Sequence, residues 1–239
     1  EQLSGINAAI VLTPRVSSHS LSNAHDLLPI GRFGVGYDSV DVAACTAADV
    51  LLYITTGAVD RPVAEATVAW MLALTHHLRT KDQLVRAGRW DDRSRYMVCE
   101  LRDRPLGIVG LGGIGRALLK LLTPFGMRQP LAYDPYLKPE AAAESGVRLV
   151  SLDELLTSSD FVSLHCPLND STRNLIGPRE LSLMQPTSYL INTARGGIVD
   201  ENALYEVLSN HRIAGAALDC FAVEPVVTPT PLMQLDNVL

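Results

Sequence analysis

The chain has 239 residues, of which 47% are hydrophobic and 19% charged, and its formal net charge is −6. This balance is typical of one large or two small globular domains with a sizeable core. An acidic chain without a long basic run argues against nucleic-acid binding, and charges interrupt every apolar run before it reaches the length of a membrane span. Four scattered cysteines without a C-x-x-C pair favour a reducing, cytoplasmic compartment and predict no metal site.

The first part of the chain reads as part of a small parallel-sheet domain. Short apolar runs alternate with one helical pattern, which is typical of α/β proteins. The expected elements are strands at 8–14, 29–36 and 50–56, with a helix at 40–49. We expect residues 1–57 to form a flavodoxin-like domain that lacks its N-terminal part, because the sequence begins close to its first strand.

An apolar helix and a polar segment follow. Residues 58–79 carry apolar side chains at helical spacing over a wide face, and Pro62 suits a first helical turn. This predicts a helix that links two domains or packs against a second subunit. Residues 86–105 are polar and irregular, so we expect an exposed loop or arm there.

The remaining chain predicts a doubly wound parallel sheet. Its expected strands are 105–110, 130–134, 148–150, 161–166, 188–194, 213–221 and 237–239. Helical patterns lie between most of them, and Ser151 with Glu154 forms a capping-box pattern, while Asp200 can cap a later helix. Residues 58–239 are therefore predicted to form a Rossmann-type domain.

A glycine-rich turn indicates the ligand of this domain. Gly110, Gly112 and Gly115 form G-x-G-x-x-G between a strand and a helix, an arrangement that lets a pyrophosphate approach the helix N-terminus. Asp134 ends the next strand, where an acid binds the adenosine ribose hydroxyls. A carboxylate there repels a 2′-phosphate, so we expect NAD rather than NADP. A glycine turn without a ligand is the less favoured alternative.

Polar residues follow three later strands, at the sheet edge that lines a ligand crevice in such folds. His165 is read equally as a cofactor contact and as a satisfied strand-end imidazole. Arg195 offers a planar fork that matches a carboxylate, and Gly196 and Gly197 let the chain turn sharply after it.

Asp219 and Glu224 follow the strand at 213–221. The apolar neighbours of Glu224 suggest an acid that is held partly out of water and needs a partner. A solvated loop carboxylate is an equal alternative.

These motifs together resemble the D-isomer-specific 2-hydroxyacid dehydrogenases. The segments that carry the resemblance, in chain order, are GRFGVGYDSVD, VAEATVAWMLAL, GIVGLGGIG, AYDPY, HCPL, INTARGGIVDE, LDCFAVEP and LDNVL. They cover nearly the whole chain. The resemblance implies an NAD-dependent, homodimeric enzyme that acts on a small 2-oxo or 2-hydroxy acid.

The resemblance also implies roles for single residues. Arg195 would hold the substrate carboxylate and polarise its carbonyl, and Glu224 would pair with a catalytic histidine and keep it protonated. Backbone N–H groups of Gly34, Val35 and Gly36 would help to hold the carboxylate. The implied cofactor contacts are Thr67, Gly110, Gly112, Gly113, Ile114, Gly115, Asp134, Pro135, His165, Cys166, Pro167, Thr172, Thr193, Ala194, Arg195 and Asp219.

The catalytic histidine itself is expected just beyond Leu239, together with a return helix. None of the six histidines replaces it: His165, the one at the right sheet edge, belongs to the cofactor loop. The sequence also departs from the family at Asp38–Asp41 and at ITTG (54–57), which leaves the substrate open. Glyoxylate, hydroxypyruvate, phosphoglycerate, lactate and bulkier acids are all candidates.

Two other functions remain possible on sequence grounds. An NAD-sensing corepressor of the same fold would bind NADH tightly without turnover. A methyltransferase would bind adenosyl-methionine and not NADH, but TARGG with the later Glu-Pro pair argues against it.

Overall fold

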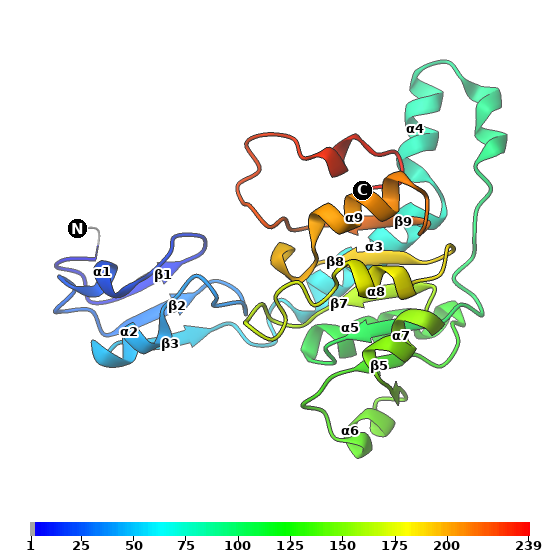
Figure 1. Ribbon diagram of the computed structural model, residues 1–239. Helices are drawn as coiled ribbons and strands as arrows, with labels where there is room; N and C mark the ends of the chain where they lie inside the picture. Colours follow the sequence, from blue (N-terminus) through cyan, green and yellow to red (C-terminus); the bar gives the residue numbers. More distant parts are fainter. Residues whose placement is uncertain (1–2) are drawn as a thin grey trace. The chain divides into compact units, whose positions relative to one another are not determined.

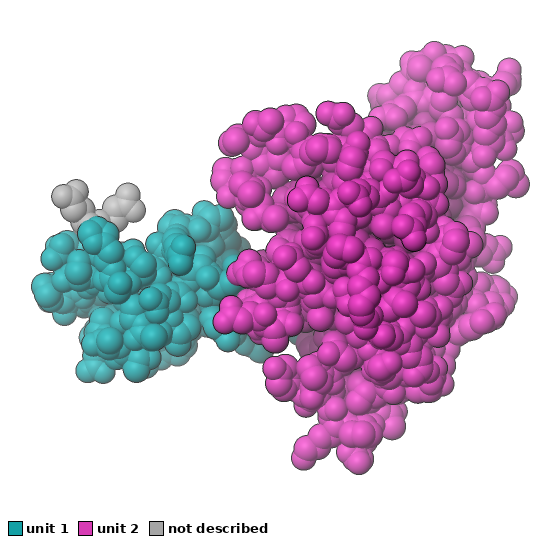
Figure 2. All heavy atoms as spheres, in the orientation of Figure 1, with its two compact units in different colours: residues 1–61 teal, residues 62–239 magenta. Residues whose placement is uncertain are grey.

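The structure is a computed structural model, and it describes residues 3–239. It divides into two compact units, Glu1–Arg61 and Pro62–Leu239, which Figure 2 distinguishes by colour. Both contain a parallel sheet with helices, so the predicted α/β class is confirmed. No helix in residues 3–239 is both long enough and apolar enough to cross a membrane.

The first unit contains a three-stranded parallel sheet in the order β1-β2-β3. Its elements are β1 (Ala9–Val11), α1 (Ser18–Leu21), β2 (Pro29–Arg32), α2 (Val42–Ala47) and β3 (Leu51–Ile54). Helix α2 begins where Asp41 accepts a hydrogen bond from the Ala44 backbone N–H at 2.9 Å. Val11, Ile30 and Cys45 are buried together, so the core of this unit lies between the sheet and its helices.

The second unit is built on a six-stranded, wholly parallel sheet in the order β6-β5-β4-β7-β8-β9 (Figure 1). Its strands are β4 (Leu106–Val109), β5 (Leu131–Tyr133), β6 (Arg148–Leu149), β7 (Phe161–Leu164), β8 (Tyr189–Asn192) and β9 (Gly215–Leu218). The chain winds outward from β4 to β6 and then returns to continue beyond β4 on its other side. The crevice of a doubly wound fold lies at this reversal, between the ends of β4 and β7.

Helices cover both faces of this sheet because its strands are apolar on both sides. In β4, Val109 belongs to one hydrophobic cluster and Ile108 to another. The first cluster contains α7 (Leu152–Ser158), α8 (Pro178–Leu183) and α9 (Glu201–Ser209). The second contains α3 (Asp60–Thr75), α5 (Gly113–Leu122) and α6 (Pro139–Glu144). Short 3-10 helices lie at η2 (Thr123–Phe125), η3 (Gly196–Ile198) and η4 (Pro231–Gln234).

Two predicted helix starts are confirmed, whereas the strand predicted at 237–239 is present only as one isolated bridge. The Ser151 hydroxyl accepts from the Glu154 N–H, and the Asp200 carboxylate accepts from the N–H groups of two residues in α9. Val238 pairs in parallel with Ala216 of β9, so residues 237–239 lie beside β9 at the edge of the sheet.

The single helix predicted for residues 58–79 is wrong. Helix α3 ends at Thr75, His77 adopts a left-handed φ of 52°, and α4 (Leu78–Arg86) then begins in a new direction. The apolar spacing continues across this break, so the periodicity did not show the change of direction. The segment expected as an irregular arm, residues 86–105, contains one short regular element, the 3-10 helix η1 (Trp90–Arg95).

Candidate functional site

The glycine turn after β4 fits a pyrophosphate for three separate reasons. Gly110 has a φ of 90°, and a Cβ on it would lie 2.8 Å from the Cys166 backbone nitrogen. A Cβ on Gly115 would lie 2.9 Å from the Gly110 carbonyl oxygen, so this glycine permits close packing of helix against strand. At Gly112, the N-cap of α5, an added Cβ would meet nothing within 4 Å. An anion can therefore approach the helix N-terminus at Gly112.

Asp134 is fixed beside this turn. It follows β5, and its two carboxylate oxygens accept hydrogen bonds from the backbone N–H groups of Leu111 and Tyr136, each at 3.0 Å. The acid thus connects the glycine turn to the end of the neighbouring strand. It holds a negative charge where the ribose of a dinucleotide would lie.

His165 is a neutral imidazole at the end of β7. Its Nε2 lies 2.9 Å from the Ser163 hydroxyl, and its buried Nδ1 has no hydrogen-bond partner within residues 3–239. Burial lowers the pKa of His165 to about 4 and raises the pKa of the Cys166 thiol to about 11. Both side chains are therefore uncharged near neutral pH, and neither offers a charge to a ligand.

The lowered pKa of His165 predicts an acid-sensitive stability. The unfolded chain protonates histidine near pH 6.5, whereas the folded chain resists protonation until the pKa of about 4 is reached. The neutral His165 therefore contributes to the free energy of unfolding. This contribution is complete above pH 6.5 and is lost as the pH falls from 6.5 to 4, so the free energy of unfolding decreases by about 2 kcal/mol by pH 5. We expect His165→Asn to reduce the pH dependence of the free energy of unfolding between pH 6.5 and pH 4. Replacing the exposed His211 with asparagine serves as the control, and an unchanged slope in His165→Asn contradicts the prediction.

The loop that follows β7 closes on itself. The Thr172 hydroxyl donates to the Pro167 carbonyl oxygen at 2.6 Å and accepts from the Asn169 N–H at 2.8 Å. Elsewhere at this sheet edge, the buried Thr67 hydroxyl of α3 lies 3.3 Å from the hydroxyl of Thr193, directly after β8. The structure therefore places two predicted cofactor residues, distant in sequence, in contact.

Arg195 lies in a loop that a buried amide holds. Asn192, the last residue of β8, donates from its side chain to the Arg195 carbonyl oxygen at 2.8 Å and accepts from the Ala194 N–H at 3.1 Å. The half-buried Arg195 donates from its guanidinium to the Ala194 carbonyl oxygen at 2.7 Å. These contacts fix the backbone on both sides of the arginine.

The predicted turn at Gly196 and Gly197 is present as the 3-10 helix η3, but it requires no left-handed backbone. Neither residue has a left-handed φ. Gly196 is instead required for close approach, because a Cβ on it would lie 1.9 Å from the Phe221 carbonyl carbon. A Cβ on Gly197 would meet the Leu168 side chain at 3.3 Å, which is a mild contact.

Asp219 and Glu224 follow β9 at the same sheet edge. The Asp219 N–H donates to the Asn192 carbonyl oxygen at 3.0 Å, which continues the pairing of β8 with β9. Burial, followed by the negative charge of Glu224, raises the pKa of Asp219. The Glu224 carboxylate accepts from the Phe221 N–H at 2.8 Å.

Of the two interpretations of Glu224, a partly buried acid and a solvated loop carboxylate, the structure supports the second. The residue is exposed, and its apolar neighbours do not shield it because Val223 is itself 78% exposed and Val227 86% exposed. An apolar stretch of sequence shields a carboxylate only where its side chains pack over that group.

Two residues that hold these loops were missed in the sequence. Asn192 was assigned only to a strand, and Glu201 only to the helix that Asp200 caps. In the structure the Glu201 carboxylate accepts from the Ala222 N–H at 2.5 Å. The polar side chain at a buried strand end was the available signal for Asn192, whereas nothing local indicated the contact of Glu201, since its partner lies in another loop.

Residues 34–36 belong to the first unit, and their predicted role in carboxylate binding stays a prediction. Gly34 follows β2 with a φ of 130°, and its N–H donates to the Thr55 hydroxyl at 3.0 Å. The Gly34 N–H is therefore engaged within the first unit.

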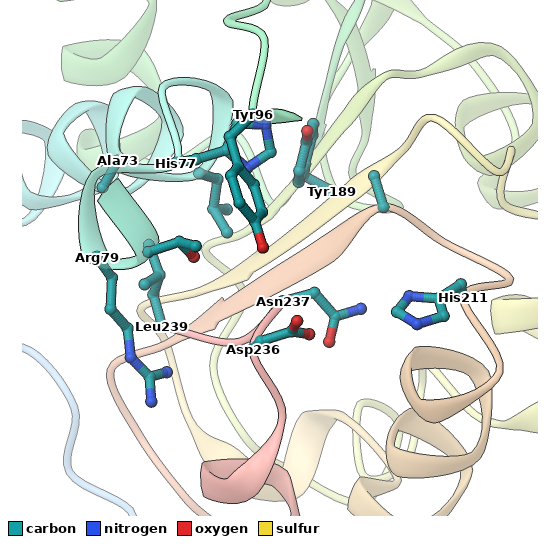
Figure 3. A pocket seen from close by; sticks show the side chains of 12 residues that line it. Ala73, His77, Arg79, Tyr96, Tyr189, His211, Asp236, Asn237 and Leu239 are labelled. Carbon is teal, nitrogen blue, oxygen red and sulfur yellow. The ribbon is translucent and has the colours of Figure 1, made fainter. Parts of the chain in front are cut away.

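A separate cavity of about 250 Å³ opens where strands of the second unit begin (Figure 3). Its lining includes Tyr189 at the start of β8, Tyr96 after η1, and Asp236 before the bridge at Val238. Apart from Thr67 in α3, the predicted cofactor residues follow strand ends, so this cavity lies at the other edge of the sheet. Within residues 3–239, no three histidine, cysteine, aspartate or glutamate side chains gather closely enough to hold a metal ion.

Similar proteins identify the second unit. Residues 68–239, well over half of the chain, match the family model described as D-isomer specific 2-hydroxyacid dehydrogenase, NAD binding domain. A D-3-phosphoglycerate dehydrogenase of Methanocaldococcus jannaschii is 40% identical over the whole chain, which covers 46% of that protein. A glyoxylate reductase of Thermococcus litoralis is 38% identical, again over the whole chain, which covers 74% of that protein.

Solved structures of similar proteins support the same family assignment. A D-lactate dehydrogenase of Aquifex aeolicus, complexed with NAD and lactic acid, is 32% identical with a TM-score of 0.89; all of this chain and 76% of that chain are covered. An acyclic imino acid reductase in complex with NADPH and D-Arg is 28% identical with a TM-score of 0.90, over all of this chain and 75% of that one. The chain spans about half the length of the phosphoglycerate dehydrogenases it matches. The chain belongs to the D-isomer specific 2-hydroxyacid dehydrogenase family, and residues 68–239 are its NAD-binding domain.

Proposed function

We propose that the protein interconverts a D-2-hydroxy acid and its 2-oxo acid with NAD. The observation that carries the proposal is the placement of Arg195, Asp219 and Glu224 after neighbouring strands, at the same sheet edge as the glycine turn. A guanidinium at this edge matches the carboxylate of such a substrate. The family relationship supports the same reaction class.

The chemistry divides among a few side chains. Bound NAD supplies the hydride acceptor or, when reduced, the hydride donor. Arg195 orients the substrate carboxylate and stabilises the charge that develops on the carbonyl oxygen. Glu224 pairs with a proton-donating histidine outside the 239 residues and raises its pKa. Asp219, whose own pKa is raised by burial, would lie near the nicotinamide of a bound NAD.

The two parts of the chain are proposed to have different roles. We assign residues 1–57 to part of the substrate domain and residues 58–239 to the NAD-binding domain. In this assignment the backbone N–H groups of residues 34–36 help to hold the substrate carboxylate. The four free cysteines support a reducing, cytoplasmic location.

A panel of 2-oxo acids tests the function. We expect NADH oxidation with at least one of glyoxylate, hydroxypyruvate and phosphohydroxypyruvate, in protein that also contains the proton-donating histidine. Glyoxylate and phosphohydroxypyruvate correspond to the names of two relatives, a glyoxylate reductase and a D-3-phosphoglycerate dehydrogenase. Tight NADH binding without turnover of any 2-oxo acid would overturn the proposal and favour an NAD-sensing corepressor.

Asp134 is expected to set the cofactor preference. Its carboxylate repels a 2′-phosphate, so NADH should bind at least about tenfold more tightly than NADPH. Asp134→Ser should weaken NADH binding and narrow this ratio, as measured by nicotinamide fluorescence during titration with each cofactor. The exposed Asp170, in the loop after β7, gives the control variant Asp170→Ser. A preference for NADPH in the unmodified protein would show that Asp134 does not select the cofactor.

We further propose a homodimer through the α4–η1 segment. Trp90 is 59% exposed, Met97 76% and Val98 50%, and together they line a hollow in this segment. Apolar side chains gathered in this way mark a protein interface. Met97→Glu should shift the sedimentation of the protein toward the monomer, whereas Val227→Glu, at a position 86% exposed, should not. A monomeric unmodified protein would contradict the proposal.

A further inference from the structure

The two loops that carry Arg195 and Glu224 are in direct backbone contact. They follow the neighbouring parallel strands β8 and β9. The Gly196 Cα lies so close to the Phe221–Ala222 peptide that an added Cβ would be 2.2 Å from the Ala222 nitrogen. A change in the position of the Phe221–Ala222 peptide therefore affects both loops.

Two glutamates hold this peptide segment. The Phe221 N–H donates to the Glu224 carboxylate at 2.8 Å, and the next N–H, of Ala222, donates to the Glu201 carboxylate at 2.5 Å. Glu224 thus binds the backbone of its own loop, whereas Glu201 approaches from a different element. Glu201 is the first residue of α9, and Asp200 caps that helix. Its side chain connects a rigid helix to the loop that carries the proposed acid–base partner.

This hydrogen bond is long-range in the sequence, because it joins the Glu201 carboxylate to a backbone N–H 21 residues further along the chain. Glu201 is half-buried, so water competes less for its oxygens than at a fully exposed position. Asn192 holds the other loop in a comparable way, from within the sheet.

We propose that Glu201 is a positioning residue for Glu224. By holding the Ala222 N–H, it fixes the 221–224 segment against Gly196 and so keeps the Glu224 carboxylate in a constant place relative to Arg195. This inference rests on the proposed function, in which both side chains act on the same substrate. Glu201 itself touches neither substrate nor cofactor.

Two substitutions separate the hydrogen bond from the charge. Glu201→Gln keeps an acceptor oxygen at nearly the same place and removes only the charge. Glu201→Ala removes both, and Asn202→Ala alters the adjacent exposed residue of the same helical turn. We expect kcat/KM to fall by about tenfold in Glu201→Ala, with NADH affinity unchanged. Glu201→Gln and Asn202→Ala should remain within about twofold of the unmodified protein.

The pH dependence of kcat/KM is the measurement that a purely structural role of Glu201 would not change. A displaced Glu224 stabilises the histidine cation less, so the alkaline limb of kcat/KM for reduction should move to lower pH in Glu201→Ala and stay in place in Glu201→Gln. An unmoved limb in Glu201→Ala overturns the inference. An equal loss of kcat/KM in Glu201→Ala and Glu201→Gln also overturns the inference, because the charge of Glu201, rather than its hydrogen bond, would then account for the effect.

Hydrogen exchange tests the contact without any turnover. The Ala222 amide should exchange at least about tenfold faster in Glu201→Ala than in Glu201→Gln. Equal exchange rates in the two variants overturn the inference. If the unmodified protein reduces no 2-oxo acid but this difference in exchange is found, the proposed reaction fails and the positioning contact stands.

Discussion

Replacing Arg195 with alanine should lower kcat/KM for every accepted 2-oxo acid by about 10²–10³-fold. The guanidinium is proposed to stabilise charge on the carbonyl oxygen as hydride arrives, so most of the loss should fall on kcat. The Asn192 side chain holds the Arg195 backbone independently of the guanidinium. The loop should therefore keep its place in the variant, and NADH affinity should change by less than about twofold.

Arg195→Lys distinguishes charge from shape. Lysine keeps the positive charge but loses the planar fork that binds both oxygens of a carboxylate, so kcat/KM should recover only partly. Arg212→Ala, at an exposed position before β9, controls for the loss of one positive charge from the surface. Unchanged kcat/KM in Arg195→Ala would contradict the assignment of the carboxylate site. Recovery to the unmodified value in Arg195→Lys would show that charge alone suffices.

The fold of the second unit could be predicted because its signals are local. Each strand is a short apolar run, the glycine turn has a fixed spacing, and caps such as Ser151 lie beside the helices they start. The break at His77 could not be predicted, since a single left-handed residue interrupts the helix without interrupting the apolar spacing. The exposure of Glu224 could not be decided from the sequence either, because it depends on how neighbouring side chains pack rather than on their order.

The candidate site could be predicted only at strand ends. Parallel strands bring their carboxyl ends to one edge, so Asp134, Arg195 and Asp219 could be placed together from their positions after strands. The contacts that hold the loops link residues far apart in sequence, as Glu201 with Ala222 and Gly196 with Phe221 show. No spacing rule predicts such contacts, because they depend on the exact separation of two loops.

Gly196→Ala and Gly197→Ala form a matched pair with very different expected results. Both add one methyl group to adjacent glycines, and neither glycine has a left-handed φ. At Gly196 the methyl carbon would lie 1.9 Å from a backbone carbonyl carbon, so one of the two loops must move. We expect a loss of more than about 3 kcal/mol in unfolding free energy, because backbone cannot yield as a side chain can.

The loss of activity in Gly196→Ala should exceed what its lower stability explains. Moving either loop changes the separation of Arg195 and Glu224, and a displacement of about 1 Å can cost about 10²-fold in kcat/KM. At Gly197 the methyl group meets the Leu168 side chain at 3.3 Å, and this side chain can rotate away. For Gly197→Ala we therefore expect a loss of less than about 1 kcal/mol in unfolding free energy and less than a threefold change in kcat/KM. Thermal unfolding and steady-state kinetics, both measured well below the melting temperature of the weaker variant, separate the two effects. Equal losses of unfolding free energy and of kcat/KM in the two variants would mean that the 193–198 and 219–224 loops are not packed backbone to backbone.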